Sequence, residues 1–312
     1  MTSLAARAEV VKLARELDTE PENLAFLLDS DPTAIRRVRQ RMHHSLDAPY
    51  RPMFQRLAKV SALLPNVIAI SIATRFFGPL LCGMIASSLS PERARALIGN
   101  VPVGFLADLA PYVDPEAAAP IVREFESQVL VPVMRELLRR KDYVTLARFL
   151  VAATDRQLLD VVPHIDNAED LLQVGFNAEL DTVADRFEVV LAQLPDDRIR
   201  AIVASAHQQD RFAEAFTFLQ FVSDTTLARV ADATVDMGDE VLAHMVESIH
   251  RENAWAEMIP IADVMSPINR QLLFELPVWT DEMLTALTRA AEANGRGEEL
   301  LDFITEASKR LE

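Results

Sequence analysis

Apolar residues recur at spacings of three and four along most of the chain. Val129, Val133 and Leu137, for example, would share one side of a helix, with Arg135 and Arg139 on the other side. No stretch shows the alternation of apolar and polar residues that is typical of half-buried strands. The pattern predicts an all-α fold of roughly twenty short helices, most of them near the average length of about 11 residues.

Predicted helix starts share a small polar or proline residue that is followed by proline or acidic residues. A cap side chain accepts hydrogen bonds from free backbone N–H groups, proline at the first position loses none, and acids complement the helix dipole. The starts expected on this basis are Ser90-Pro91-Glu92, Asp114-Pro115-Glu116, Pro195-Asp196-Asp197, Ser266-Pro267 and Thr280-Asp281-Glu282.

A short motif of an apolar residue, alanine and a charged residue recurs at intervals of 37 to 44 residues. Two or three helices in about 40 residues is the period of HEAT and armadillo units. We therefore expect a right-handed α-solenoid, a superhelix with a period of about 40 residues. The four copies are Leu106-Ala107-Asp108, Leu146-Ala147-Arg148, Val183-Ala184-Asp185 and Leu227-Ala228-Arg229.

The segment 87–122, SSLSPERARALIGNVPVGFLADLAPYVDPEAAAPIV, resembles the short-helix repeats of the cytosolic N-domains of MgtE-type magnesium transporters and of related flagellar-motor proteins. The likeness covers roughly a third of the chain and includes no diagnostic residue. It implies an architecture of brief helices with acidic caps that stack into a superhelix, and it assigns no ion-binding residue.

Composition supports the helical interpretation and limits the classes of function. Half of the residues are hydrophobic, only 8 are glycine and only 6% are aromatic, which favours helices over sheets. A single cysteine, Cys82, and an N-terminus without a signal-peptide pattern predict a cytoplasmic protein. The net charge of −16 argues against nucleic-acid binding and favours a basic protein partner.

Charge and hydropathy predict three parts of the chain. Residues 1–60 hold ten Lys or Arg and eight Asp or Glu, a mildly basic helical cap, and residues 90–312 form an acidic helical-repeat body. Residues 61–89 contain one charge, and Pro65 and Gly78-Pro79 divide them into an apolar hairpin of two helices. Such runs are too short to span a membrane, so no transmembrane segment is predicted. The hairpin is expected to be buried, to be shared with a partner, or to contact a membrane surface.

A cluster of arginines in residues 36–44 has two interpretations. At helical spacing Arg37 and Arg41 share a face, as do Arg36 and Arg39. One interpretation is a solvated face that pairs with the acidic body. The other is a docking patch for an anionic partner or a lipid headgroup.

One helix carries side chains that could bind a metal. Glu240, His244, Glu247 and His250 are spaced by four, three and three residues, and Glu247 and His250 form the Glu-x-x-His pair used in di-iron bundles. Such a site needs a second Glu-x-x-His helix, which the chain lacks. We therefore predict no metal, no cofactor and no catalytic residue, and keep these four as the candidates if a metal binds.

Aromatic residues could line a pocket for an apolar small molecule or lipid, although aromatics at helical spacing are also typical of a core. The candidates for an apolar ligand are Phe76, Phe77, Phe212, Phe216, Phe218 and Trp255.

The sequence leaves three classes of function open. The favoured one is a non-enzymatic helical-repeat scaffold that binds a protein partner or a second copy of the chain. The first alternative is a binder of an apolar small molecule or lipid through the 61–89 hairpin and the phenylalanines. The second alternative is an enzyme without a short sequence motif.

Overall fold

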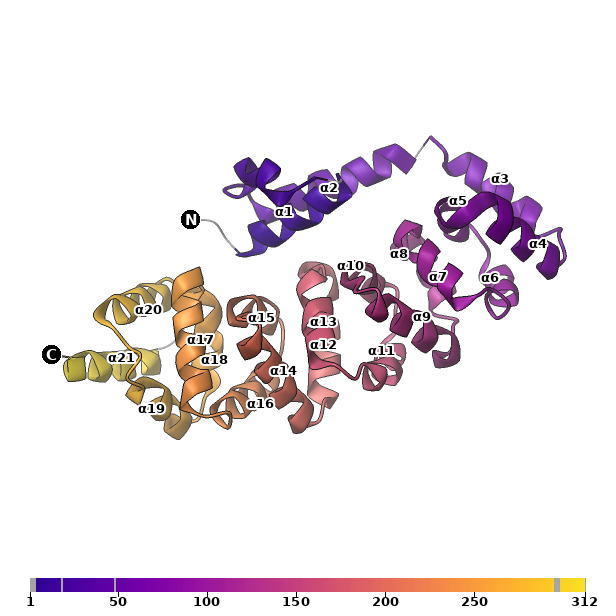
Figure 1. The fold of residues 1–312 in the computed structure, drawn as a ribbon. Helices are drawn as coiled ribbons and strands as arrows, with labels where there is room; N and C mark the ends of the chain where they lie inside the picture. Colours follow the sequence, from indigo (N-terminus) through magenta and orange to yellow (C-terminus); the bar gives the residue numbers. More distant parts are fainter. Residues whose placement is uncertain (1–3, 18, 48, 295–297, 312) are drawn as a thin grey trace. The chain divides into compact units, whose positions relative to one another are not determined.

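The computed structural model describes residues 4–17, 19–47, 49–294 and 298–311, and throughout these ranges the regular secondary structure is helical, with no strand (Figure 1). The all-α prediction is confirmed. Contacts divide the chain into two compact units, Met1–Asp166 with Asn177–Thr182, and Asn167–Phe176 with Val183–Glu312. The predicted division at residues 60 and 90 is a different one and stays a prediction.

The first unit contains short helices joined by tight turns. They are α1 (Leu4–Glu16), η1 (Pro21–Leu27), α2 (Pro32–Asp47), α3 (Arg51–Ser61), α4 (Asn66–Ile72), the π-helical turn η2 (Ala73–Phe77), α5 (Gly78–Ala86), α6 (Pro91–Ile98), α7 (Val103–Leu109), η3 (Ala110–Tyr112), α8 (Pro115–Val122), α9 (Ser127–Arg139), α10 (Tyr143–Arg148), η4 (Phe149–Val151), α11 (Asp155–Val161) and η5 (Val162–His164).

Most helices of the second unit are longer, and α12 and α13 carry the boundary between the units. The helix α13 departs from helical geometry at Val183, the first residue of the second unit after the boundary. The helices are α12 (Ala168–Asn177), α13 (Leu180–Gln193), α14 (Asp196–Gln208), α15 (Phe212–Leu219), α16 (Asp224–Val235), α17 (Asp239–Glu252), α18 (Trp255–Val264), α19 (Pro267–Glu275), α20 (Asp281–Asn294) and α21 (Glu298–Leu311).

Helices pack against the next helix but one within each unit. In the first unit α3 contacts α5, α5 contacts α7, α7 contacts α9 and α9 contacts α11. In the second unit the same order joins α14, α16, α18 and α20. In these stretches each helix therefore packs against the one that follows its immediate neighbour in the chain.

Polar caps begin many of these helices, as the sequence predicts. Ser90 accepts from the backbone N–H of Arg93, and the Asp114 carboxylate accepts from the N–H groups of Glu116 and Ala117. A cap of this kind stabilises a helix by about 1 kcal/mol. The predicted starts at Ser266 and Thr280 are also confirmed by side-chain caps, and α14 begins directly after Pro195.

Two copies of the recurring sequence motif make the same long-range contact. Arg148 donates to the backbone oxygens of Pro111, at 2.8 Å, and Val113, at 3.3 Å. Arg229 likewise donates to the backbone oxygen of Leu194, at 2.8 Å, and to the Asp196 carboxylate, at 2.6 Å. Each arginine reaches back 35 to 37 residues to carbonyls near the end of an earlier helix or turn, which the helix itself leaves without a donor.

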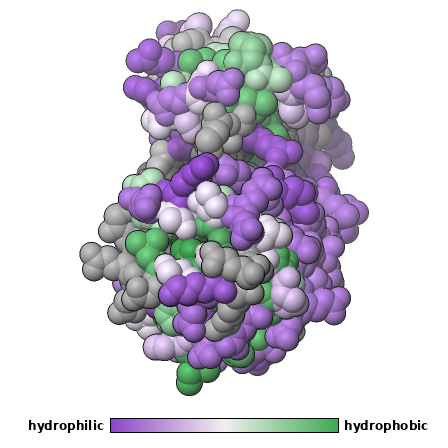
Figure 2. All heavy atoms as spheres, turned by 90° about the vertical axis from the view of Figure 1, so that its left-hand side faces the viewer, coloured by the Kyte–Doolittle hydropathy of each residue, from purple (hydrophilic) through white to green (hydrophobic). Residues whose placement is uncertain are grey.

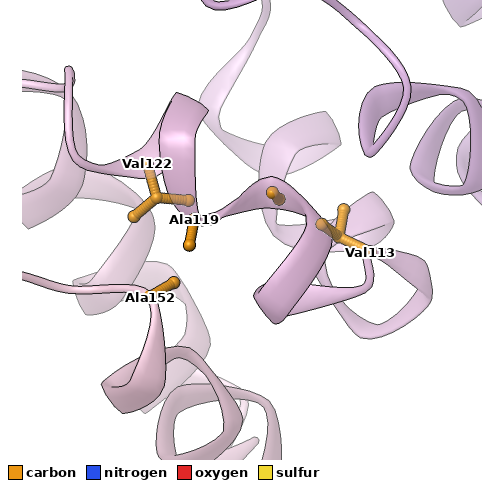
Figure 3. Close-up of a cluster of buried hydrophobic side chains, with 5 residues drawn as sticks. Val113, Ala119, Val122 and Ala152 are labelled. Atoms are coloured by element: carbon orange, nitrogen blue, oxygen red, sulfur yellow. The ribbon is translucent and has the colours of Figure 1, made fainter.

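Small side chains let the helices of the first unit approach closely. In one buried cluster Ala119 and Val122 of α8 lie close to Ala152, which follows η4, and Val113 belongs to the same cluster (Figure 3). The second unit buries larger side chains, Leu273 and Leu287 among them. On the side of the molecule where α19 to α21 lie, hydrophilic residues cover most of the visible surface (Figure 2).

Candidate functional site

The segment from α3 to α5 has a small core of its own, and α4 to α5 cover most of the apolar hairpin predicted for residues 61–89. Phe54 and Ala58 of α3 pack against Ile85 of α5, and Leu81 and Met84 cover the contact. The prediction that this hairpin is buried is wrong, because Gly83 and Ile85 are the only buried residues of α4, η2 and α5, which the structure describes in full. Much of the apolar surface of these helices is therefore exposed to solvent.

Large apolar side chains protrude from this segment. Leu63, Val67 and Phe76 are 83%, 79% and 78% exposed, and their neighbours Val60 and Leu80 are more than half exposed. Soluble proteins rarely expose so many large apolar side chains within one short segment unless the segment binds something. We call residues 60–80 the apolar hairpin, and it is the candidate site of this protein.

The helical run Asn66–Ala86 is long and apolar enough, by length and composition, to cross a membrane. Its backbone is not one straight rod, because Gly78 has φ +70° and ψ 173° and ends the preceding helical turn. The residues before Gly78 span about 18 Å and those from Gly78 on about 14 Å, whereas a bilayer core is about 30 Å thick. The break at Gly78 lies where the sequence predicts one, and each part alone is too short to cross a bilayer core.

Every charged residue close in sequence to the apolar hairpin is a cation. The sequence has no Asp or Glu between Asp47 and Glu92, although the whole chain has a net charge of −16. All the cations of this interval are exposed, and within the described part of the chain none of them forms an ion pair. They are Arg51, Arg56, Lys59 and Arg75.

The turn between α3 and α4 is held in place from α6. Arg93 donates to the backbone oxygens of Ser61, at 2.6 Å, and Leu64, at 2.9 Å, and to the side-chain oxygen of Asn66, at 2.6 Å. Leu63 lies between these anchored residues. The most exposed apolar side chain of the hairpin therefore stands on a fixed backbone, which lowers the entropic cost of binding.

Close backbone packing anchors α5 just beyond the apolar hairpin. A Cβ atom at Gly83 would come within 2.7 Å of both the Leu109 carbonyl oxygen and the Tyr112 Cβ atom, so only glycine fits between α5 and the end of α7. Cys82, beside it, is half-buried, and burial raises the pKa of its thiol, which makes it a weak nucleophile.

The arginine cluster is split between an internal ion-pair network and the solvent. Glu9, which is 1% exposed, accepts from Arg36 at 2.9 Å and from Arg39 at 3.4 Å. Arg39 also donates to Glu16 and to Glu179, the latter in the segment that follows α12. The structure thus brings Arg36 and Arg39 together inside the first unit.

Arg37 and Arg41 lie on the exposed side of α2, as their spacing predicts. Arg37 is 3.7 Å from the Asp31 carboxylate at the start of the same helix, and both side chains are more than half exposed. Of the four predicted partner-binding arginines, these two present their charge to solvent, and their role as a docking patch stays a prediction.

In the ion-pair network, burial and electrostatic attraction shift the pKa values of the charged side chains in opposite directions. Burial lowers the pKa of the Lys12 ammonium, and attraction to Glu9 offsets part of that effect. Burial acts to raise the pKa of Glu179, but the charge and hydrogen bond of Arg39 outweigh it and leave the pKa below its usual range. Lys12 also donates to the backbone oxygen of Ala178, at 2.9 Å, so the network joins α1 and α2 to the segment after α12.

The four candidate metal ligands of α17 do not converge on one point. Glu240 and Glu247 are exposed, and His244 Nδ1 lies 2.7 Å from His207 Nδ1, with its Nε2 3.0 Å from the Asp210 carboxylate. Within the described residues no group of three or more His, Cys, Asp or Glu side chains is placed to hold a metal ion. His244 thus faces α14 and the residue that follows it by two positions, Asp210.

His250 is half-buried beside Trp255, with ring centroids 5.9 Å apart. It lines an open depression of about 600 Å³. Charged and polar side chains of both signs surround this depression, which makes it a poor fit to an apolar ligand. The other lining residues are Arg251, Asn253, Asp281, Glu282, Thr285, Ala286 and Arg289.

The aromatic candidates for an apolar ligand differ in exposure. Phe76 and Phe77 belong to the apolar hairpin, where Phe77 is 40% exposed. Phe212, Phe216 and Trp255 are buried in the core of the second unit, 2% to 5% exposed, where they contact other aromatic rings. The side chain of Phe218 lies outside the described residues.

No protein-family model, curated protein or solved structure matches the chain. The resemblance of residues 87–122 to MgtE-type N-domain repeats stays a prediction.

The residues predicted to bind a partner do not include the four cations close to the apolar hairpin, although a pattern in the sequence indicates them. The pattern is the interval from Asp47 to Glu92, which contains four cations and no acid. Dividing the chain at residue 60 makes this pattern hard to recognise, because the boundary separates three of the cations from the apolar residues that they flank.

Proposed function

We propose that this protein is a helical-repeat binding module that docks onto its partner through the apolar hairpin, residues 60–80. The observation that carries the proposal is the near-complete exposure of Leu63, Val67 and Phe76 in a segment with its own small core. Large exposed apolar groups favour burial against a partner by roughly 25 cal/mol for each Å² of apolar surface. A cytoplasmic location stays part of the proposal.

The repeat architecture is the second part of the proposal. Contacts between alternate helices, together with matching arginine contacts from Arg148 and Arg229, support an α-solenoid with a period near the 37 to 44 residues of the motif spacing. A stack of this kind is rigid enough to hold a short hairpin at a defined place. The acidic remainder of the chain would favour a basic protein partner at a different surface.

The side chains of the apolar hairpin offer contact area and positive charge, which suit binding. Cys82, the only thiol of the chain, lies two residues beyond the hairpin, where it is half-buried and has a raised pKa. This combination favours the binding classes of function over the enzyme class. An exposed apolar hairpin is compatible with both a protein-binding scaffold and a lipid binder.

Photo-crosslinking in living cells tests the proposal. A benzophenone amino acid is placed at Val67 of the full chain, and the matched control carries it at Ile268 of α19, which is 72% exposed but distant in sequence from the hairpin. Because the partner covers Val67, we expect adducts at Val67 in clear excess over Ile268. Mass spectrometry then identifies each adduct as protein, lipid or a second copy of this chain.

Any of these three adducts, if specific to Val67, supports docking through the hairpin. Equal adduct yields at Val67 and Ile268, or none at either position, would contradict it.

A further inference from the structure

We infer that the partner of the apolar hairpin is the surface of an anionic lipid bilayer, into which Leu63, Val67 and Phe76 insert at the boundary between headgroups and acyl chains. The inference rests on the proposed function, because it names the partner of the same surface. It does not need a transmembrane segment, since each half of the helical run is too short to span a bilayer.

Charge is the first argument for a membrane. Arg51, Arg56, Lys59 and Arg75 flank or lie within the hairpin, are exposed, and within the described residues have no acidic partner. Segments that lie in the membrane interface typically combine apolar side chains with nearby cations and few acids. Lipid phosphates attract the cations, and the acyl region takes up the apolar groups. In a chain with a net charge of −16, four unpaired cations thus lie beside the most apolar surface.

The acidic body does not cancel this attraction. At physiological ionic strength charges more than about 8 Å apart are largely screened. The potential that a lipid headgroup meets at the hairpin is therefore set mainly by the closest charges, and the charges between Asp47 and Glu92 in the sequence are all cations. The distant acids would act on the orientation of the molecule and keep its other surfaces away from an anionic bilayer.

Shape is the second argument. Leu63, Val67 and Phe76 are each about four-fifths exposed, so they protrude from the surface and do not line a groove. Protruding side chains need a soft partner that closes around them, which a bilayer provides without a matching pocket. Arg93 fixes the turn that carries Leu63, so the hairpin meets the membrane already ordered.

Co-sedimentation of the purified full chain with vesicles tests the inference. One set of vesicles contains phosphatidylcholine alone, and the other contains three parts phosphatidylcholine to one part phosphatidylglycerol. We expect binding to the anionic vesicles to be at least about tenfold stronger than to the neutral ones and to weaken at high salt, because several cations each contribute about fivefold at an anionic surface.

Two variants separate the apolar contribution from the charge contribution. L63S/V67S/F76S removes the inserting groups, and R51Q/R56Q/K59Q/R75Q removes the cations; each is expected to weaken binding to anionic vesicles by about tenfold or more. All of these side chains are exposed, so circular dichroism should report an unchanged helix content. The matched control, R135Q/K141Q/R156Q/R289Q, removes the same number of exposed cations from other parts of the chain and should bind like the unmodified chain.

Three results would overturn the inference. They are no binding to anionic vesicles, equal binding to both vesicle types, and an equal loss in the control variant. If vesicles do not bind but the benzophenone at Val67 captures a protein, the partner is a protein and the proposed function stands. If both experiments fail, the hairpin is not the binding surface.

Discussion

Replacing Glu9 with glutamine is expected to destabilise the N-terminal helices α1 and α2 by about 3–5 kcal/mol, which is the cost of removing one partner from a buried ion pair. Glu9 is 1% exposed and accepts from Lys12, Arg36 and Arg39. Without its negative charge three cations remain, with Glu16 and Glu179 as the acidic partners of Arg39, in a site from which water is mostly excluded. The contacts of Lys12 and Arg39 to residues 178 and 179 should loosen with it.

Hydrogen exchange measured by mass spectrometry reports this effect helix by helix. In Glu9→Gln the amides of α1 and α2 should exchange faster, while those of the second unit keep their rates. The exposed Glu20→Gln is the matched control and should change stability by less than about 0.5 kcal/mol. Adding Lys12→Met to Glu9→Gln removes one of the uncompensated cations, so protection should partly return. Unchanged exchange in Glu9→Gln would show that Glu9 is not the centre of a buried network.

Replacing Gly83 with alanine is expected to cost about 1–3 kcal/mol, the usual cost of overpacking a core. The added Cβ atom would lie 2.7 Å from the Leu109 carbonyl oxygen and 2.7 Å from the Tyr112 Cβ atom. Both belong to the ends of rigid elements, so α5 itself has to move. Urea denaturation and the hydrogen exchange of α5 should both detect the change.

Gly99 supplies the matched control for this substitution. It ends α6 with ordinary helical dihedral angles, and a Cβ atom there would meet nothing within 4 Å. Gly99→Ala should therefore be neutral or stabilise the protein by up to about 1 kcal/mol, through a smaller entropy of the unfolded chain. Equal stabilities of Gly83→Ala and Gly99→Ala would contradict the close contact between α5 and the end of α7.

The local rules of helix formation account for most of what the sequence could predict. Ser90, Asp114 and Ser266 cap helices where their side chains and the following residues require it. The break at Gly78 followed from the glycine and proline that stand there. These features depend on residues within one turn of each other, which is why the sequence alone identifies them.

The positions of the clustered arginines could not be predicted in the same way. Arg36, Arg37, Arg39 and Arg41 look alike in the sequence, and helical spacing only groups them in pairs. Arg39 is buried because Glu179, 140 residues away, lies beside it, and local spacing does not contain that contact. Long-range packing decides which of several equivalent charges becomes internal.

Exposure of the apolar hairpin also depended on tertiary structure. A nearly uncharged run has no polar face, so its pattern cannot say which side is covered. The charge pattern around it was more informative, because the interval from Asp47 to Glu92 contains no acid in a strongly acidic chain. An interval of this kind favours a binding surface over an ordinary core hairpin on the amino-acid sequence alone.

Hydroxyl-radical footprinting of Phe76, Phe54 and Phe26 decides whether a partner covers the apolar hairpin, once on the purified chain and once in intact cells that produce it. Phe76 and Phe26 are 78% and 75% exposed, whereas Phe54 is 6% exposed. In the purified protein Phe76 and Phe26 should oxidise at similar rates and Phe54 should be protected. In cells Phe76 should become protected while Phe26 is not, because the partner covers the hairpin. Protection of Phe76 in the purified monomer, or equal oxidation of Phe76 and Phe26 in cells, would contradict the claim that the apolar hairpin is the binding surface.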